Sequence, residues 1–121
     1  MKKSDISGSN TQPITISAKD FSLTPAVRQY VEMKIGKLWH YNRAIQRIGV
    51  ELDVDHNQIK GRKHRIEVWV YLPGRTLQAG LKAEHMREAI DLVYPKIERQ
   101  VVAEKEQARD WRHRQRPVPS D

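Results

Sequence analysis

The residues best suited to chemistry in this chain are its histidines and a short run of carboxylates. None of the histidines stands two or four residues from another; they are His40, His56, His64, His85 and His113. Sequence-local metal sites usually show such close spacing, so the sequence predicts no metal site. His56 and His64 flank one predicted hairpin, and we interpret both as exposed loop residues.

Three carboxylates, Glu51, Asp53 and Asp55, alternate along one predicted strand and therefore share a face. Paired carboxylates can act as general acid and base in catalysis. Arg65 and other cations lie on the neighbouring predicted strand, however. We therefore interpret these carboxylates as partners in cross-strand charge pairs.

No other catalytic pattern is present in the sequence. The chain has no cysteine, which excludes disulfides and thiolate chemistry. Its glycines lack the spacing of a phosphate-binding loop, and no Gly-x-Ser-x-Gly sequence occurs. The sequence therefore predicts a protein that is not an enzyme and that uses no cofactor.

The charge of the chain indicates binding instead. Lysine and arginine total 22 against 15 aspartates and glutamates, which gives a formal net charge of +7. Residues 1–12 and 110–121 contribute only +1 each, so +5 remains on the body of the chain. In a small domain this excess favours a polyanionic partner, nucleic acid before a membrane surface.

Aromatic residues accompany these cations in one predicted helix. Tyr30, Lys34, Lys37 and Tyr41 recur at steps of four, three and four residues. Such interleaving can hold an RNA backbone and stack a base. The alternative is that the tyrosine rings complete the core while the lysine stems cover its edge.

A second aromatic pair, Trp69 and Tyr71, points outward from a predicted strand. These rings are candidates for stacking on nucleobases. The alternative is that they pair with Arg65 and with each other across the sheet.

The element that organises these residues is a long amphipathic helix predicted over 83–109. Its apolar stripe consists of Met86, Ile90, Val93, Ile97 and Val101. Pro95 removes one backbone hydrogen bond inside this helix. We therefore expect a bend near 91–94 or a late helix start.

The remaining pattern predicts one α+β domain over 13–109, in the order β-α-β-β-β-α. Strands are predicted at 13–17, 45–55, 64–72 and 76–83. An earlier helix begins with Thr24 as N-cap and Pro25 in the first turn, and ends around His40 and Tyr41. Residues 1–12 are predicted to form a flexible lead, and 110–121 an unstructured basic tail.

The order of elements also predicts the topology of a four-stranded mixed sheet. Because a helix connects the first two strands, they should be parallel, with a right-handed crossover. The second, third and fourth strands should form an antiparallel meander. Both helices should pack on one face and leave the other face exposed to solvent.

Nothing in the sequence predicts insertion into a membrane. No segment approaches the roughly 18 apolar residues of a membrane span, and no apolar run follows the basic start of the chain. We therefore expect a cytoplasmic protein.

Several segments together resemble a known family, the ribosome hibernation-promoting factors, also called ribosome-associated inhibitors or the sigma-modulation family. The similar segments are Ile16–Ser17, Leu23–Val31, Lys34–Leu38, Val68–Ala79, Met86, Ala89–Val93 and Lys96–Gln100. The resemblance covers roughly 14–105. The sequence departs from the family pattern at His85-Met86-Arg87, where an Asp-Met-Tyr entry is usual, and at Pro95. It resembles the short members, which lack an additional C-terminal domain.

The resemblance implies the β-α-β-β-β-α fold and binding to the small ribosomal subunit near the decoding centre. Such proteins overlap the mRNA and tRNA paths and silence translation in starved or stationary cells. The RNA-binding residues that the resemblance implies by position are Arg28, Lys34, Lys37, Lys96 and Arg99. Further candidates are Lys82, Arg87 and Lys105.

Two other functions remain open from the sequence. One is a general RNA- or DNA-binding module, because basic helices on α+β domains serve many polymers. The other is a protein-interaction adaptor that uses the exposed sheet face. For the ribosome-binding function we expect a monomer that takes no small-molecule substrate.

Overall fold

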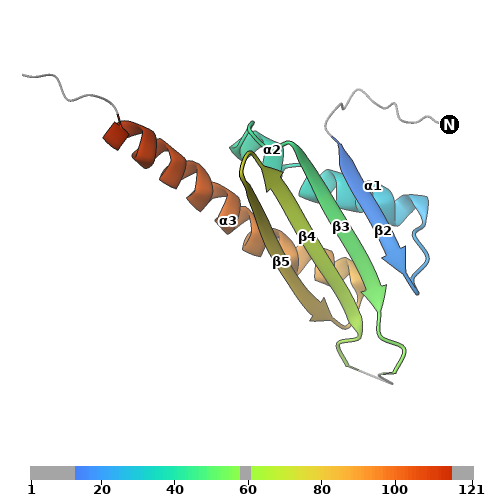
Figure 1. The fold of residues 1–121 in the computed structure, drawn as a ribbon. Coiled ribbons are helices and arrows are strands. Elements are labelled where there is room, and N and C mark those ends of the chain that lie inside the picture. Colours follow the sequence, from blue (N-terminus) through green and yellow to red (C-terminus); the bar gives the residue numbers. More distant parts are fainter. Residues whose placement is uncertain (1–12, 58–60, 116–121) are drawn as a thin grey trace, which may run out of the picture.

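The computed structural model describes residues 13–57 and 61–115, with side chains described up to Ala108 (Figure 1). The predicted lead at 1–12 and the last residues of the predicted tail, 116–121, lie outside this part. The elements in chain order are β2 (Ile14–Lys19), α1 (Pro25–Ile35), α2 (Leu38–Tyr41), β3 (Arg47–Val54), β4 (His64–Leu72), β5 (Arg75–Ala83) and α3 (Met86–Gln115).

The four strands form one mixed sheet in the order β2-β3-β4-β5. β2 pairs with β3 in parallel, with Ile16 opposite Val50. β3, β4 and β5 are antiparallel to one another. The predicted fold class and topology are therefore confirmed, and β4 has the bounds predicted from its alternation.

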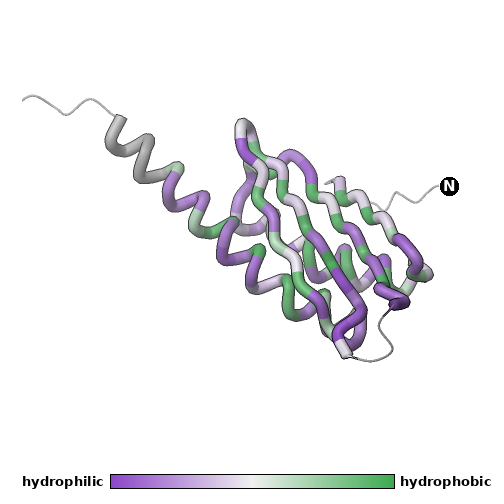
Figure 2. Tube along the Cα trace, turned by 60° about the horizontal axis from the view of Figure 1, so that its bottom comes forward, coloured by the Kyte–Doolittle hydropathy of each residue, from purple (hydrophilic) through white to green (hydrophobic). Residues whose placement is uncertain are grey.

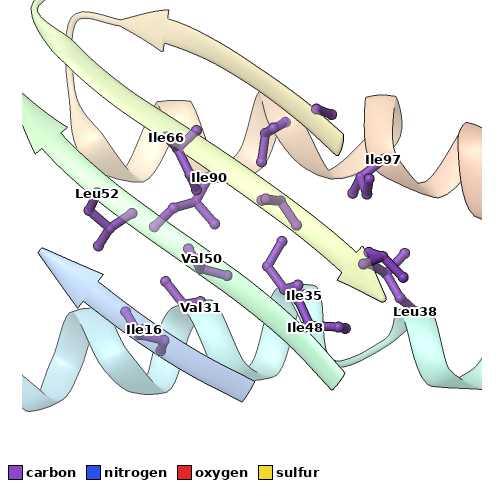
Figure 3. Close-up of a cluster of buried hydrophobic side chains, with 14 of the residues drawn as sticks. Ile16, Val31, Ile35, Leu38, Ile48, Val50, Leu52, Ile66, Ile90 and Ile97 are labelled. Atoms are coloured by element: carbon purple, nitrogen blue, oxygen red, sulfur yellow. The ribbon is translucent and has the colours of Figure 1, made fainter. Parts of the chain in front are cut away.

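The core lies between the sheet and the helices. Along β3, and along β4 from Ile66 onward, every second residue is buried, and Figure 2 shows the strands alternating between hydrophobic and hydrophilic positions. The buried strand residues include Ile48, Val50, Leu52 and Ile66, and they meet Val31 and Ile35 of α1 and Ile90 and Ile97 of α3 (Figure 3). The predicted apolar stripe of α3 is fully engaged in this core.

α1 begins as predicted, because the side chain of Thr24 accepts a hydrogen bond of 3.2 Å from the backbone N–H of Val27. It does not continue to Tyr41 as one helix. The N–H groups of Trp39 and His40 donate to the carbonyls three residues earlier, at Gly36 and Lys37. Glycine has a low helix propensity, and this tighter hydrogen-bond pattern begins at Gly36. The α-helix is therefore interrupted there. The prediction of a single helix to 40–41 is therefore wrong.

α3 begins later and ends later than predicted. Ala83 is still part of β5, where it pairs with His64 of β4, and the helix begins only at Met86. It continues through Pro95 to Gln115, beyond the predicted end at Arg109. No glycine or proline occurs between Pro95 and Pro117 that would stop it. Residues 110–115, predicted as unstructured, are therefore helical.

Candidate nucleic-acid interface

The seam between α1 and α3 is built from aromatic, acidic and basic side chains. Tyr30 packs against the core, and its hydroxyl donates a hydrogen bond to Oδ1 of Asp91. The Nζ of Lys34 lies 3.5 Å from the same carboxylate. The guanidinium of Arg87 stacks over the Tyr30 ring, 4.4 Å from its centroid. Tyr30 thus completes the core, as the alternative interpretation of the aromatic–basic row predicts.

Farther along the seam, Tyr41 of α2 approaches Tyr94 and Glu98 of α3. The carboxylate of Glu98, as hydrogen-bond acceptor and as a negative charge, raises the pKa of the Tyr41 hydroxyl. Burial, reinforced by the charge of Glu98, raises the pKa of Tyr94 to about 12. The Tyr94 hydroxyl is buried and has no hydrogen-bond partner among the described residues. Both tyrosines therefore stay protonated at neutral pH, and the seam carries negative charge on Asp91 and Glu98.

The predicted cations of α1 do not share one flank of that helix. Lys34 lies in the seam, and Lys37 is exposed at the break between α1 and α2. Arg28 precedes Tyr30 by two residues, which is about 200° around a helix, so it lies on the flank away from α3. Arg28 is exposed there.

The predicted cations of α3 also divide between its sides. Arg87 faces α1, and Arg99 is exposed. Lys96 is one helical turn before Gln100, whose amide donates a hydrogen bond of 2.7 Å to the carbonyl of Gln78 in β5, so Lys96 lies toward β5. Lys105 directly follows Glu104, which forms a 3.2 Å ion pair with Arg75.

Lys82 is separated from all of these cations. It alternates along β5 with the buried Ala83, so its side chain lies on the face of the sheet opposite the helices. There it lines a hollow of about 390 Å³ together with Lys19, Asp53 and Arg65. The structure therefore does not bring Lys82 together with the helix cations.

The open face of the sheet also contains the predicted cross-strand charges. Arg65 lies 3.1 Å from Asp53 and 3.4 Å from Glu67, and the hydrogen bond with Asp53 is the main reason that the pKa of Arg65 is raised. The predicted pairing is thus confirmed for Asp53. Glu51, in contrast, stands directly opposite Glu67 in the register rather than opposite a cation.

One cationic region was missed by the sequence analysis. His40 and Arg43 are exposed beside a hollow of about 620 Å³ that is also lined by Trp39 and Gln46. The connection between α2 and β3 is fixed, because the indole N–H of Trp39 donates to the Ile45 carbonyl at 3.0 Å. No carboxylate lines this hollow among the described residues. The signal in the sequence was Arg43, which follows shortly after the end of the basic helix.

Neither a metal site nor a membrane span emerges from the described part of the chain. No group of three histidine or carboxylate side chains within 13–57 and 61–108 could hold a metal ion. The described helices include none that is long and apolar enough to cross a membrane.

Comparisons with known proteins identify relatives of this chain. The family described as Sigma 54 modulation protein / S30EA ribosomal protein matches residues 14–109. The ribosome hibernation promoting factor of Azotobacter vinelandii is 32% identical over 107 residues, covering 88% of this chain and 95% of that protein. The ribosome hibernation promotion factor of Bacillus subtilis is 30% identical over 86 residues, which cover 71% of this chain and 44% of that protein.

A solved structure shares the fold. A ribosomal subunit interface protein from Coxiella burnetii superimposes with a TM-score of 0.69 at 23% identity, covering 78% of this chain and 99% of that chain. At this identity the likeness concerns the arrangement of the strands and helices.

Proposed function

The chain belongs to the family of Sigma 54 modulation proteins and S30EA ribosomal proteins, and on that premise we propose that it is a ribosome hibernation factor. In this proposal it binds the small ribosomal subunit near the decoding centre and occludes the mRNA and tRNA sites. It thereby keeps ribosomes inactive during starvation or stationary phase. The observation that carries the proposal is the match to a relative named for ribosome hibernation over nearly the full length of both chains.

The proposed docking surface is the helical side of the molecule. Its exposed cations are Lys37, Arg87, Lys96, Arg99 and Lys105, with Arg28 on the outer flank of α1. Such side chains can neutralise ribosomal RNA phosphates and release bound counterions. His40 and Arg43 extend this surface past the end of α2. Lys82 is not part of it, because it lies on the other face of the sheet.

Lys34 has a special place in this surface. It is only partly exposed, and it already shares its charge with Asp91. To bind a phosphate, Lys34 must give up its contact with the Asp91 carboxylate. Its net contribution to the free energy of RNA binding should therefore be smaller than that of Lys37. The geometry therefore favours Lys37, Arg87 and Arg99 as the main contacts.

The proposed inhibition is steric and needs no catalysis, cofactor or second copy of the chain. A domain held by phosphate contacts in the mRNA and tRNA path excludes those ligands while it remains bound. The protein would act in the cytoplasm, where ribosomes translate. The salt dependence of its binding should be steep, because each neutralised phosphate releases counterions.

Co-sedimentation with purified small subunits tests the proposal. The full chain should pellet with the subunits at low salt and be released at high salt. The double variant Lys37→Glu/Arg99→Glu should lose binding. The exposed Arg62, in the β3–β4 connection, offers a control, because Arg62→Glu makes the same kind of charge change outside the helices. Failure of the unaltered chain to pellet at low salt contradicts the proposal.

Competition distinguishes the proposal from a general nucleic-acid-binding function. Bulk tRNA or duplex RNA in mass excess should displace a general binder from the subunits but should leave a ribosome-specific factor bound. In a translation reaction programmed with mRNA, the chain should reduce product formation. The double variant should not.

A further inference from the structure

The open face of the sheet is divided into two chemically different halves. One half contains the charged residues Glu51, Asp53, Arg65 and Glu67 and the hollow described above. The other half contains Trp69 and Tyr71 of β4 and Arg47 and Gly49 of β3, which the register places opposite one another. The helices cover the opposite face, so these rings have no part in the main core.

Gly49 leaves room between the two rings. A Cβ atom at this position would lie 3.8 Å from Cε3 of Trp69 and 3.7 Å from Cε2 of Tyr71. Both rings come from β4 and therefore lie over the backbone of β3 at Gly49, where that position adds no side chain. Both rings are half-buried, so part of each remains accessible to solvent.

Arg47 supplies positive charge at the edge of this aromatic pair. Its guanidinium lies 3.9 Å from the centroid of the Tyr71 ring. Arg47 itself is exposed. A guanidinium stacked on an aromatic ring can still bind a phosphate oxygen through its remaining N–H groups.

The carboxylate nearest to Trp69 along β4 is held away from this region. Glu67 accepts a hydrogen bond of 2.6 Å from Nε2 of Gln78 and lies 3.4 Å from Arg65. Its carboxyl group lies over Gly80 of β5, where a Cβ atom would come within 2.5 Å of Oε2. The negative charge is therefore partly neutralised and fixed toward β5.

We propose that Trp69, Tyr71 and Arg47 form a binding platform for the unpaired bases of single-stranded RNA. Exposed aromatic rings on a sheet stack on bases of any sequence, and an adjacent arginine holds the backbone. A duplex hides the faces of its bases, so the platform selects single strands. This site lies on the face opposite the proposed ribosome-docking surface and does not depend on that function.

The test uses the full chain and fluorescein-labelled hexauridylate and hexaadenylate, with binding measured by fluorescence anisotropy. Trp69→Leu and Tyr71→Leu should each weaken binding roughly 5- to 100-fold, as loss of one stacked base implies. Trp69→Phe and Tyr71→Phe are the matched controls, because they retain a ring and should retain most of the affinity. Urea unfolding of each variant establishes that it is folded.

A hexanucleotide that lacks its bases separates the contribution of base stacking from that of the phosphate charges. It should bind more weakly than the base-containing hexamers, and equally to the unaltered chain and to Trp69→Leu. The loss caused by Trp69→Leu should also be the same at low and high salt, whereas Arg47→Gln should reduce the salt dependence.

Equal binding of hexauridylate by the unaltered chain and by both leucine variants overturns the proposal, as does equal binding of the base-free and base-containing hexamers. Pelleting of the leucine variants with small subunits is a separate measurement. Loss of oligonucleotide binding with intact pelleting supports the platform, and failure of pelleting in the unaltered chain contradicts only the ribosomal function.

Discussion

The hydroxyl of Tyr30 on α1 donates a hydrogen bond to the carboxylate of Asp91 on α3. This contact joins the two helices on the surface where the proposed function places RNA. The same carboxylate lies beside Lys34, so one acidic residue both ties the helices together and reduces the local positive charge. Under the proposed function, stability and RNA affinity are therefore opposed at Asp91.

Removal of the Tyr30 hydroxyl should destabilise the fold. Tyr30→Phe leaves the Asp91 carboxylate without this donor and should cost about 1.5–3 kcal/mol, the range for a hydrogen bond to a charged group. Urea unfolding measures the change. Tyr94→Phe is the matched control, because the Tyr94 hydroxyl is buried without a partner in the described structure, so its removal should be neutral or stabilising. An equal loss in both variants contradicts this account.

Neutralising Asp91 should strengthen binding to the small subunit. Asp91→Asn keeps an oxygen that can accept from Tyr30 but releases Lys34 from its ion pair. Partly exposed pairs contribute up to about 1 kcal/mol, so we expect an affinity gain of up to about fivefold. Co-sedimentation titrations measure it. In a Lys34→Met background the gain should shrink, and an undiminished gain would mean that Lys34 is not the residue released.

High pH should destabilise the protein through Tyr94. Its pKa is raised to about 12 in the folded chain, above the usual value of 10, so the folded state favours the protonated hydroxyl. The resulting stability is complete below pH 10 and is lost as the pH rises toward 12. Urea midpoints measured between pH 9 and 12 should fall less steeply for Tyr94→Phe than for the unaltered chain. Parallel curves would contradict the assignment.

A side chain at Gly80 should be costly, although glycine is usually unfavourable within a strand. In Gly80→Ala the new Cβ would lie 2.5 Å from Oε2 of Glu67 and 3.0 Å from the Ile66 carbonyl oxygen. We expect a loss at the low end of about 1–3 kcal/mol, because the Glu67 carboxyl group ends a flexible side chain whereas the Ile66 carbonyl cannot move away as easily. Adding Glu67→Ala should recover part of this loss. If the double variant is no more stable than expected from the two single variants, the carboxyl group is not the obstacle.

Replacement of Pro95 should stabilise α3. Pro95 lies inside the helix and is exposed, and it cannot donate to the carbonyl of Asp91 one turn earlier. Pro95→Ala restores that donor and removes a residue of very low helix propensity. We expect a gain of about 1–3 kcal/mol in the free energy of unfolding. A thermal or urea transition unchanged by the substitution would show that the helix has already adapted to the proline.

The sequence predicted the elements whose periodicity was unbroken. β4 follows from the strict alternation of Ile66, Val68 and Val70 with charged and aromatic residues, and the core face of α3 follows from its stripe. The family resemblance is confirmed by the match over 14–109. The break at Gly36 was missed because the apolar spacing continues across it to Leu38, and spacing does not register a change in hydrogen-bond pattern.

The placement of the candidate binding residues depended on information that is only partly in the sequence. Strand alternation already placed Lys82 outward, on the face away from the helices, so its separation from the helix cations could have been recognised. The pairing of Lys34 with Asp91 could not, because it depends on how α1 and α3 pack. The roles of the candidate cations in RNA binding, and the boundaries of the domain at 13 and 109, remain predictions.

The length of α3 has a consequence for the overall shape of the protein. The ion pair between Arg75 and Glu104 ties the helix to β5, and residues 105–108 after it are exposed. Figure 1 shows α3 projecting past the end of the sheet. From Glu104 to Gln115 the helix adds about 16 Å of length. The molecule is thus a compact body with a projecting rod, and a spectroscopic label on that rod would report the body's orientation when its basic face is docked.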